Sequence, residues 1–78
     1  MSIVALIEIR AEDVSHVKEK LQSKEYVSAL YELMGRFNIG IIVEAKSKEE
    51  LFDITASIRE FPQVEETKTH FIHDGVVI

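Results

Sequence analysis

The stretch from Tyr26 to Ala45, YVSALYELMGRFNIGIIVEA, constrains the fold more than any other part of the sequence. Two runs rich in β-branched and aromatic residues, 27–31 and 39–43, flank the sequence Gly35-Arg36-Phe37-Asn38. Glycine and asparagine tolerate turn conformations, and two such runs separated by a few residues containing glycine are typical of a β-hairpin. The sequence therefore predicts a strand, a tight turn and a second strand in this region.

The residues that precede the hairpin predict one strand and one helix. Residues 3–10 are β-branched and nearly continuously apolar, which favours a strand buried on both faces, at least in its first half. Residues 13–24 then carry Val14, Val17 and Leu21 at helical spacing. Asp13 is a candidate N-cap for this helix, because a carboxylate accepts hydrogen bonds from the first free N–H groups.

The residues after the hairpin predict the same two kinds of element in the opposite order, a helix and then a strand. Ser47 and Glu50 form a capping box, which predicts a helix starting at Ser47. Its apolar stripe comprises Leu51, Ile54, Ile58 and Phe61, with Phe52 and Thr55 alongside, and Pro62 ends it. Residues 64–72 alternate between polar and apolar and predict a fourth strand, and the tail 73–78 is either a further short strand or a loose end.

The predicted order of strand, helix, strand, strand, helix and strand is that of the α+β, ferredoxin-like βαββαβ sandwich. Right-handed crossovers place both helices on one face of a four-stranded antiparallel sheet. A chain of 78 residues is long enough for one domain with one core. We therefore expect a single domain over residues 1–78.

The other face of this sheet is predicted to be apolar as well. Strict alternation along the strands assigns Val4, Leu6, Leu30, Met34 and Ile42, or their neighbours, to the face away from the helices. A monomer rarely exposes so large an apolar patch, so we expect this face to pack on a second subunit, most simply as a two-fold dimer. The alternative is a set of tolerated apolar residues on the surface.

Composition excludes several classes of function. Nine basic against fourteen acidic residues give a net charge of −5, which disfavours direct binding to nucleic acid. The sequence has no cysteine, no apparent signal peptide and no apolar run long enough to cross a membrane, so a cytoplasmic protein is expected. The three histidines are not spaced as metal ligands, and no catalytic or phosphate-binding motif is present, so neither a metal nor a cofactor is expected.

Several segments together resemble one protein family. They are 33–43 (LMGRFNIGIIV), 47–51 (SKEEL), 58–64 (IREFPQV) and 66–69 (ETKT). In order and spacing they are similar to the effector domain of the Lrp/AsnC transcription regulators, also called the RAM domain, over residues 1–72. The hairpin of that family typically reads Gly-x-x-Asp, and here neutral Asn38 stands at the position of the aspartate.

The resemblance implies a stand-alone effector module without the helix-turn-helix of the longer regulators. In the family the domain dimerises through its sheets, dimers assemble into rings, and amino acids or similar metabolites bind between dimers. A full-length regulator is a further partner that the resemblance allows, reached through the same surfaces. The ligand-contacting residues implied for this chain are Met34, Gly35, Arg36, Asn38, Thr67 and Thr69.

Two other classes of function remain open from the sequence. One is a small dimeric ferredoxin-like enzyme, which needs a cavity and a buried polar group, for which His16 and Tyr31 are the candidates. The other is a structural assembly module that binds no ligand. An enzyme predicts turnover, an effector module predicts ligand at subunit boundaries, and a structural module predicts an assembly that ignores metabolites.

Overall fold

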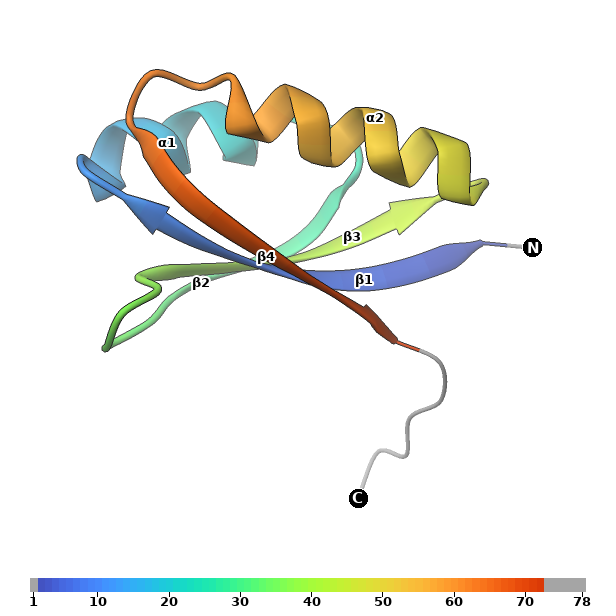
Figure 1. Ribbon diagram of the computed structural model, residues 1–78, viewed down its shortest axis with the longest axis horizontal. Coiled ribbons are helices and arrows are strands. Elements are labelled where there is room, and N and C mark those ends of the chain that lie inside the picture. The colour runs from blue at the N-terminus through green and yellow to red at the C-terminus, as the bar shows by residue number, and fades with distance from the viewer. Residues whose placement is uncertain (1, 73–78) are drawn as a thin grey trace.

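The computed structural model describes residues 2–72 and confirms the predicted order of elements (Figure 1). The strands and helices follow one another along the chain with short connections. They are β1 (Ile3–Ala11), α1 (Val14–Gln22), β2 (Val27–Glu32), β3 (Ile39–Ala45), α2 (Lys48–Arg59) and β4 (Val64–Ile72).

The four strands form one antiparallel sheet in the order β2-β3-β1-β4. Both helices lie on the same side of this sheet, and the opposite side carries no element of the chain within the described residues (Figure 1). The ferredoxin-like sandwich predicted from the sequence is therefore confirmed. Strands β2 and β4 are the two edges, and β1 runs through the middle with a partner on each side.

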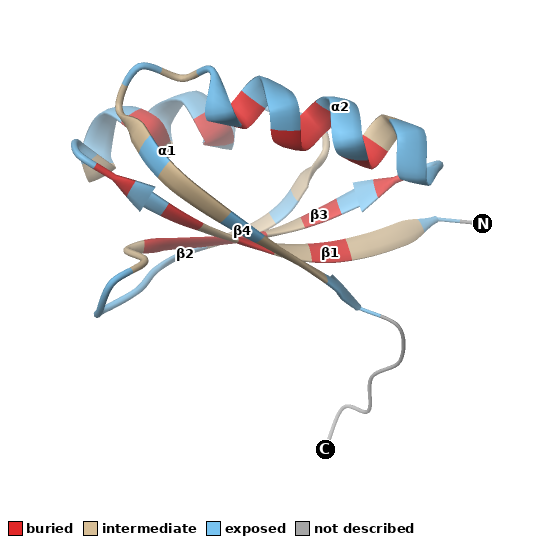
Figure 2. Cartoon of the chain, viewed as in Figure 1, coloured by how far each residue is buried: buried red, intermediate tan, exposed pale blue. Residues whose placement is uncertain are grey.

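The core lies between the sheet and the two helices. Alternate residues of β1 and β3 point into it, and buried and less buried positions alternate along both strands except at Gly40, which is also buried (Figure 2). The helices contribute their predicted apolar stripes. The completely buried members with the largest side chains are Ile7, Ile9, Val17, Leu21, Ile39, Ile41, Val43, Leu51 and Ile58.

Both helices begin with the caps that the sequence predicts. The carboxylate of Asp13 accepts a hydrogen bond from the backbone N–H of His16 at 3.1 Å, and the hydroxyl of Ser47 accepts one from the N–H of Glu50, also at 3.1 Å. These bonds satisfy backbone donors that the first turn of a helix leaves free. Helix α1 begins at Val14, one residue later than the predicted range 13–24, and ends earlier, at Gln22. The predicted helix is otherwise confirmed.

The assignment of β2 to the two faces by strict alternation is wrong. A bulge at Ser28 lies between Val27, which pairs with Val43, and Ala29, which pairs with Ile42. One extra residue reverses the direction of every later side chain in the strand. Leu30 consequently packs against the core, and Ala29 and Tyr31 lie on the face away from the helices.

Two further expectations about burial need correction. Within the chain β1 is buried on one face only, because the helices cover only one side of the sheet, and Val4 and Leu6 stay half-buried. On α2 the predicted neighbour Thr55 is buried, but Phe52 points outward and is 59% exposed. The predicted short strand or loose end at 73–78 lies outside the described residues.

Candidate functional site

The turn between β2 and β3 is closed by backbone hydrogen bonds and fixed to the middle of the sheet. The N–H of Leu33 donates to the carbonyl of Asn38 at 2.9 Å, which closes the loop 33–38. The N–H of Asn38 donates to the carbonyl of Ile9 on β1 at 3.0 Å. The base of the predicted ligand-binding turn therefore sits on β1 and is held in one place.

Both polar atoms of the Asn38 side chain form hydrogen bonds with Ala11 at the end of β1. Its Oδ1 accepts a hydrogen bond from the N–H of Ala11 at 2.8 Å, and its Nδ2 donates to the carbonyl of Ala11 at 2.9 Å. The amide thus pairs with Ala11 as a neighbouring strand would, and it continues the β3 side of the ladder past Ile39. Both polar atoms that the sequence offers to a ligand at this position therefore already hold one structural hydrogen bond each.

The tip of the turn projects into solvent. Gly35 has a φ of +125°, which residues with a side chain rarely adopt, and the neighbouring Met34 is completely exposed. In the described part of the chain, the backbone N–H groups of residues 34–37 have no hydrogen-bond partner. Unpaired backbone donors in an exposed turn are suited to a carboxylate.

Gly35→Ala is expected to lower the free energy of unfolding by about 1–2 kcal/mol, because the positive φ is strained for alanine. A Cβ at this position would meet no other atom within 4 Å, so the effect comes from the backbone alone. Urea unfolding measures it, with Met34→Ala as a control at the neighbouring exposed position. Equal stability of Gly35→Ala and wild type would mean that the turn relaxes to another conformation.

Arg36 connects the turn to β4, and this contact is not predicted by the sequence. Its guanidinium donates to the Glu66 carboxylate at 2.7 Å, across the sheet from the hairpin to the edge strand. The hydrogen bond and the negative charge of Glu66 raise the pKa of Arg36. Only the pairing of β1 with both β3 and β4 brings residues 30 positions apart together, so no local spacing could have revealed Glu66.

Thr67 and Thr69 lie on the helix side of the sheet, unlike the Arg36–Glu66 pair. They stand opposite Ile9 and Ile7 of β1, whose side chains are in the core, and both threonines are half-buried. Thr67 also lines a hollow of about 270 Å³ with Arg59, Val64, Glu65 and Glu66. Within one chain, the turn and the two threonine side chains therefore do not share a site.

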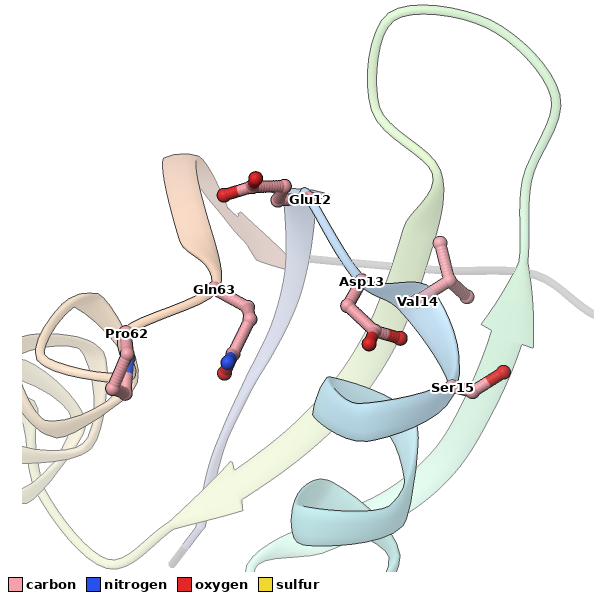
Figure 3. Close-up of a pocket in the computed structure, with 6 residues that line it drawn as sticks. All are labelled: Glu12, Asp13, Val14, Ser15, Pro62 and Gln63. Atoms are coloured by element: carbon pink, nitrogen blue, oxygen red, sulfur yellow. The ribbon is translucent and has the colours of Figure 1, made fainter.

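Another hollow, of about 520 Å³, lies at the start of α1 and contains none of the predicted site residues. Figure 3 shows the side chain of Gln63 between Pro62 and Asp13, with Ser15 pointing away from it. The carboxylate of Asp13 caps α1, and the N–H of Glu12 donates to the carbonyl of Gln63 at 2.8 Å. These bonds make the hollow a junction between the β1–α1 and α2–β4 connections.

The groups that an enzyme or a metal would need are not assembled in the described residues. His16 and Tyr31 are both exposed, so neither is the buried polar group that the enzyme alternative requires. The Nε2 atom of His70 lies 2.7 Å from the carboxylate of Glu8. Residues 2–72 contain no group of three or more histidine, aspartate or glutamate side chains placed to hold a metal.

The face of the sheet away from the helices carries an apolar area. Leu6 and Ile42 stand opposite each other at its centre, and both are half-buried. Tyr31 is 56% exposed and Ile72 is 42% exposed. With Val4 and Ala29, these residues form what we call the open face: Val4, Leu6, Ala29, Tyr31, Ile42 and Ile72.

None of the helices in the described region has the length and apolarity needed to cross a bilayer.

Comparison with solved structures gives close matches of fold. Escherichia coli AsnC superposes with a TM-score of 0.87 and 20% identity over 97% of this chain and 54% of AsnC. FFRP-DM1 superposes with a TM-score of 0.85 and 26% identity over 90% of this chain and 97% of its own. A feast or famine regulatory protein from M. tuberculosis, complexed with L-methionine, gives 0.83 and 23% identity over 97% and 53%.

The chain thus spans about half the length of AsnC and nearly all of FFRP-DM1. A search of curated protein sequences finds no significant match. The sequence model of the Lrp/AsnC ligand-binding domain matches residues 2–77, which is almost the whole chain. Together with the βαββαβ topology and the hairpin described above, this match shows that the chain belongs to the Lrp/AsnC ligand-binding domain family.

Proposed function

We propose that this protein is a sensing module that binds an amino acid or a similar small metabolite and couples binding to its own assembly. The observation that carries this proposal is the turn 34–37, whose tip is exposed and whose backbone N–H groups have no hydrogen-bond partner in the described residues, while its base is fixed to β1. The rigid base keeps the donors in position before a ligand arrives, which lowers the entropy cost of binding. Membership of a ligand-binding family supports this interpretation and favours it over an enzyme.

Assembly is proposed to begin with a two-fold dimer in which two open faces pack together. The central residues Leu6 and Ile42 are apolar on a side of the sheet that neither helix covers. A two-fold axis places the same patch on both subunits, so a self-complementary apolar face is sufficient to form the contact. Further association of dimers into a ring would then bring turns and β4 strands of different dimers together.

The proposed ligand contacts the turn of one dimer and β4 of another. Gly35 lets the ligand approach the main chain, and the N–H groups of residues 34–37 bind its carboxylate. The hydroxyls of Thr67 and Thr69 supply polar contacts from the second dimer. The M. tuberculosis regulator was solved with L-methionine, which makes methionine the first amino acid to test here.

One observation favours a second candidate, the structural module that binds no ligand. The Asn38 side chain already bonds to Ala11 through both Oδ1 and Nδ2 and is neutral, so it gives a ligand less than the aspartate typical of the family would. In that case the domain would assemble through the same open face and would not respond to metabolites. The two candidates differ only in the response to ligand.

The test is light scattering and thermal unfolding of the purified protein, with each of the common amino acids at millimolar concentration. A ligand at a hundred times its Kd stabilises the folded state by about 2.7 kcal/mol, which raises the Tm by several degrees. We expect one or a few amino acids, methionine tested first, to raise the Tm and shift the mass toward a larger assembly. A constant mass and Tm across the whole panel would contradict the sensing function and support the structural module.

A further inference from the structure

We infer that Arg36 and Glu66 together bind the head group of an α-amino acid, the guanidinium taking its carboxylate and the Glu66 carboxylate taking its ammonium. This inference rests on the proposed function and assigns specificity within that site. The two side chains come from the turn and from β4 of the same subunit, so one subunit would hold the head group and the Thr67 and Thr69 hydroxyls of the second dimer would contact the rest of the ligand.

The turn itself has no charged acceptor for the ammonium group of an amino acid. An ammonium group needs an acceptor, and a charged one binds it more strongly than a neutral one. Asn38 is a poorer acceptor than a carboxylate, because its Oδ1 is neutral and already accepts a hydrogen bond from the N–H of Ala11. Of the remaining carboxylates, Glu66 has a direct contact with the turn, through Arg36 at 2.7 Å.

Both members of the pair are accessible to a small molecule. The side chain of Arg36 is 67% exposed and that of Glu66 is 41% exposed. The guanidinium of Arg36 also lies 6.0 Å from the centre of the Phe37 ring, so the arginine side chain contacts both the turn and β4.

The exchange of contacts balances in charge. Before binding, one ion pair joins Arg36 to Glu66. A zwitterion inserted between them replaces it by two, guanidinium with ligand carboxylate and Glu66 with ligand ammonium, and no proton moves. Opening an exposed ion pair costs little, since such pairs contribute little to stability, whereas the bidentate guanidinium–carboxylate contact adds directional specificity. A ligand that lacks either charge leaves one member of the opened pair without a partner.

The other interpretation is that the pair is only a strap that holds the turn against β4. The two interpretations differ in what each single substitution does to ligand recognition. Arg36→Met and Glu66→Gln remove one charge each and keep most of the side chain. A strap predicts the same loss for every ligand, whereas recognition of a head group predicts a loss that depends on which charge the ligand carries.

The chain offers a matched control pair. Arg10 and Glu65 form another exposed ion pair between β1 and β4, with the Nε of Arg10 3.7 Å from the carboxylate of Glu65. Their side chains are 46% and 51% exposed, close to the values of the tested pair. Arg10→Met and Glu65→Gln therefore make the same chemical changes beside the site without touching the turn.

The experiment measures ligand affinity by titration calorimetry for wild type and the four variants. The probes are L-methionine, 4-(methylthio)butanoate, which lacks the amine, and 3-(methylthio)propylamine, which lacks the carboxylate. If another amino acid gives the largest response in the panel described above, it and its two analogues replace them. We expect wild type to bind the amino acid about 10- to 100-fold more tightly than either analogue, since each analogue loses one charged hydrogen-bonded contact.

Glu66→Gln is expected to weaken amino-acid binding about 10- to 100-fold and to leave binding of the amine-free analogue as tight or tighter, because that ligand no longer leaves the Glu66 charge without a partner. Arg36→Met should weaken the binding of both the amino acid and the amine-free analogue. The control variants Arg10→Met and Glu65→Gln should bind all probes like wild type. Amino-acid binding that survives both Arg36→Met and Glu66→Gln overturns the inference and leaves the sensing function intact. An equal loss of affinity for all three probes in Glu66→Gln would also overturn the inference and leave the sensing function intact. A wild type that binds no amino acid overturns both the inference and the sensing function.

Discussion

Leu6→Lys is expected to convert the proposed open-face dimer into a folded monomer. Leu6 lies at the centre of the open face, opposite Ile42 on one side and His70 on the other. Burying a leucine at an interface contributes about 1.5–3 kcal/mol, and a two-fold dimer loses this contribution twice. The dissociation constant should therefore rise by about two to four orders of magnitude, which light scattering over a concentration series measures directly.

The monomer should stay folded, because Leu6 is only half-buried within its own chain and contributes little to the core between sheet and helices. Ala56→Lys is the control, since Ala56 is exposed on α2 and lies on the other side of the sheet. Its mass should match that of wild type at every concentration. A Leu6→Lys protein that keeps the dimer mass would show that the subunits meet through another surface.

Asn38→Asp is expected to destabilise the protein by about 1–3 kcal/mol, although it restores the residue typical of the family hairpin. Ala11 presents one donor and one acceptor, and the asparagine amide matches both. A carboxylate still accepts from the N–H, but it has no hydrogen to give to the carbonyl and places its charge beside that oxygen. Urea unfolding at neutral pH gives the difference in free energy.

Gln22→Glu makes the same amide-to-carboxylate change at the exposed end of α1 and serves as its control. Its cost should stay within about 0.3–1 kcal/mol, from a negative charge near a helix C-terminus. If Asn38→Asp is as stable as wild type, the Ala11 contact is not required for the fold. The amide would then be free to contact a ligand.

The sequence predicts the architecture well because its signals are local. Asp13 and Ser47 mark the helix starts through bonds that reach only three residues along the chain. The turn residues between two apolar runs define the hairpin, and the period of Val17 and Leu21 defines the buried side of α1. Each of these features depends on neighbours in the chain, so one sequence suffices to find it.

The composition of the open face could be predicted only in part. Val4, Leu6 and Ile42 follow from alternation along regular strands. In β2 the bulge at Ser28 reverses the alternation, so Ala29 and Tyr31 replace the expected Leu30. A bulge depends on how two strands align, and neither strand alone contains a signal for it.

The contacts of the candidate-site residues were the hardest to predict from the sequence, because they too depend on how distant strands align. The residue types at Gly35 and Asn38 indicate a turn, but the roles of the Asn38 amide and the Arg36 guanidinium are set by contacts 27 and 30 residues away. Glu66 looks like an ordinary solvated charge in the sequence. Its contact with Arg36 emerges only when β1 joins the hairpin to β4.

Gly40 gives the open face an unusual composition, because it lies on that face in the middle of β3 and contributes no side chain. Leu33, at the start of the turn, fills the gap, and its Cδ1 lies 3.1 Å from where a Cβ of residue 40 would stand. Part of the surface on which a second subunit would rest is therefore supplied by the turn. In the proposed sensing function Leu33 would link the two events, because a ligand at the turn and a second subunit on the open face would bear on the same side chain, and each would then change the affinity for the other.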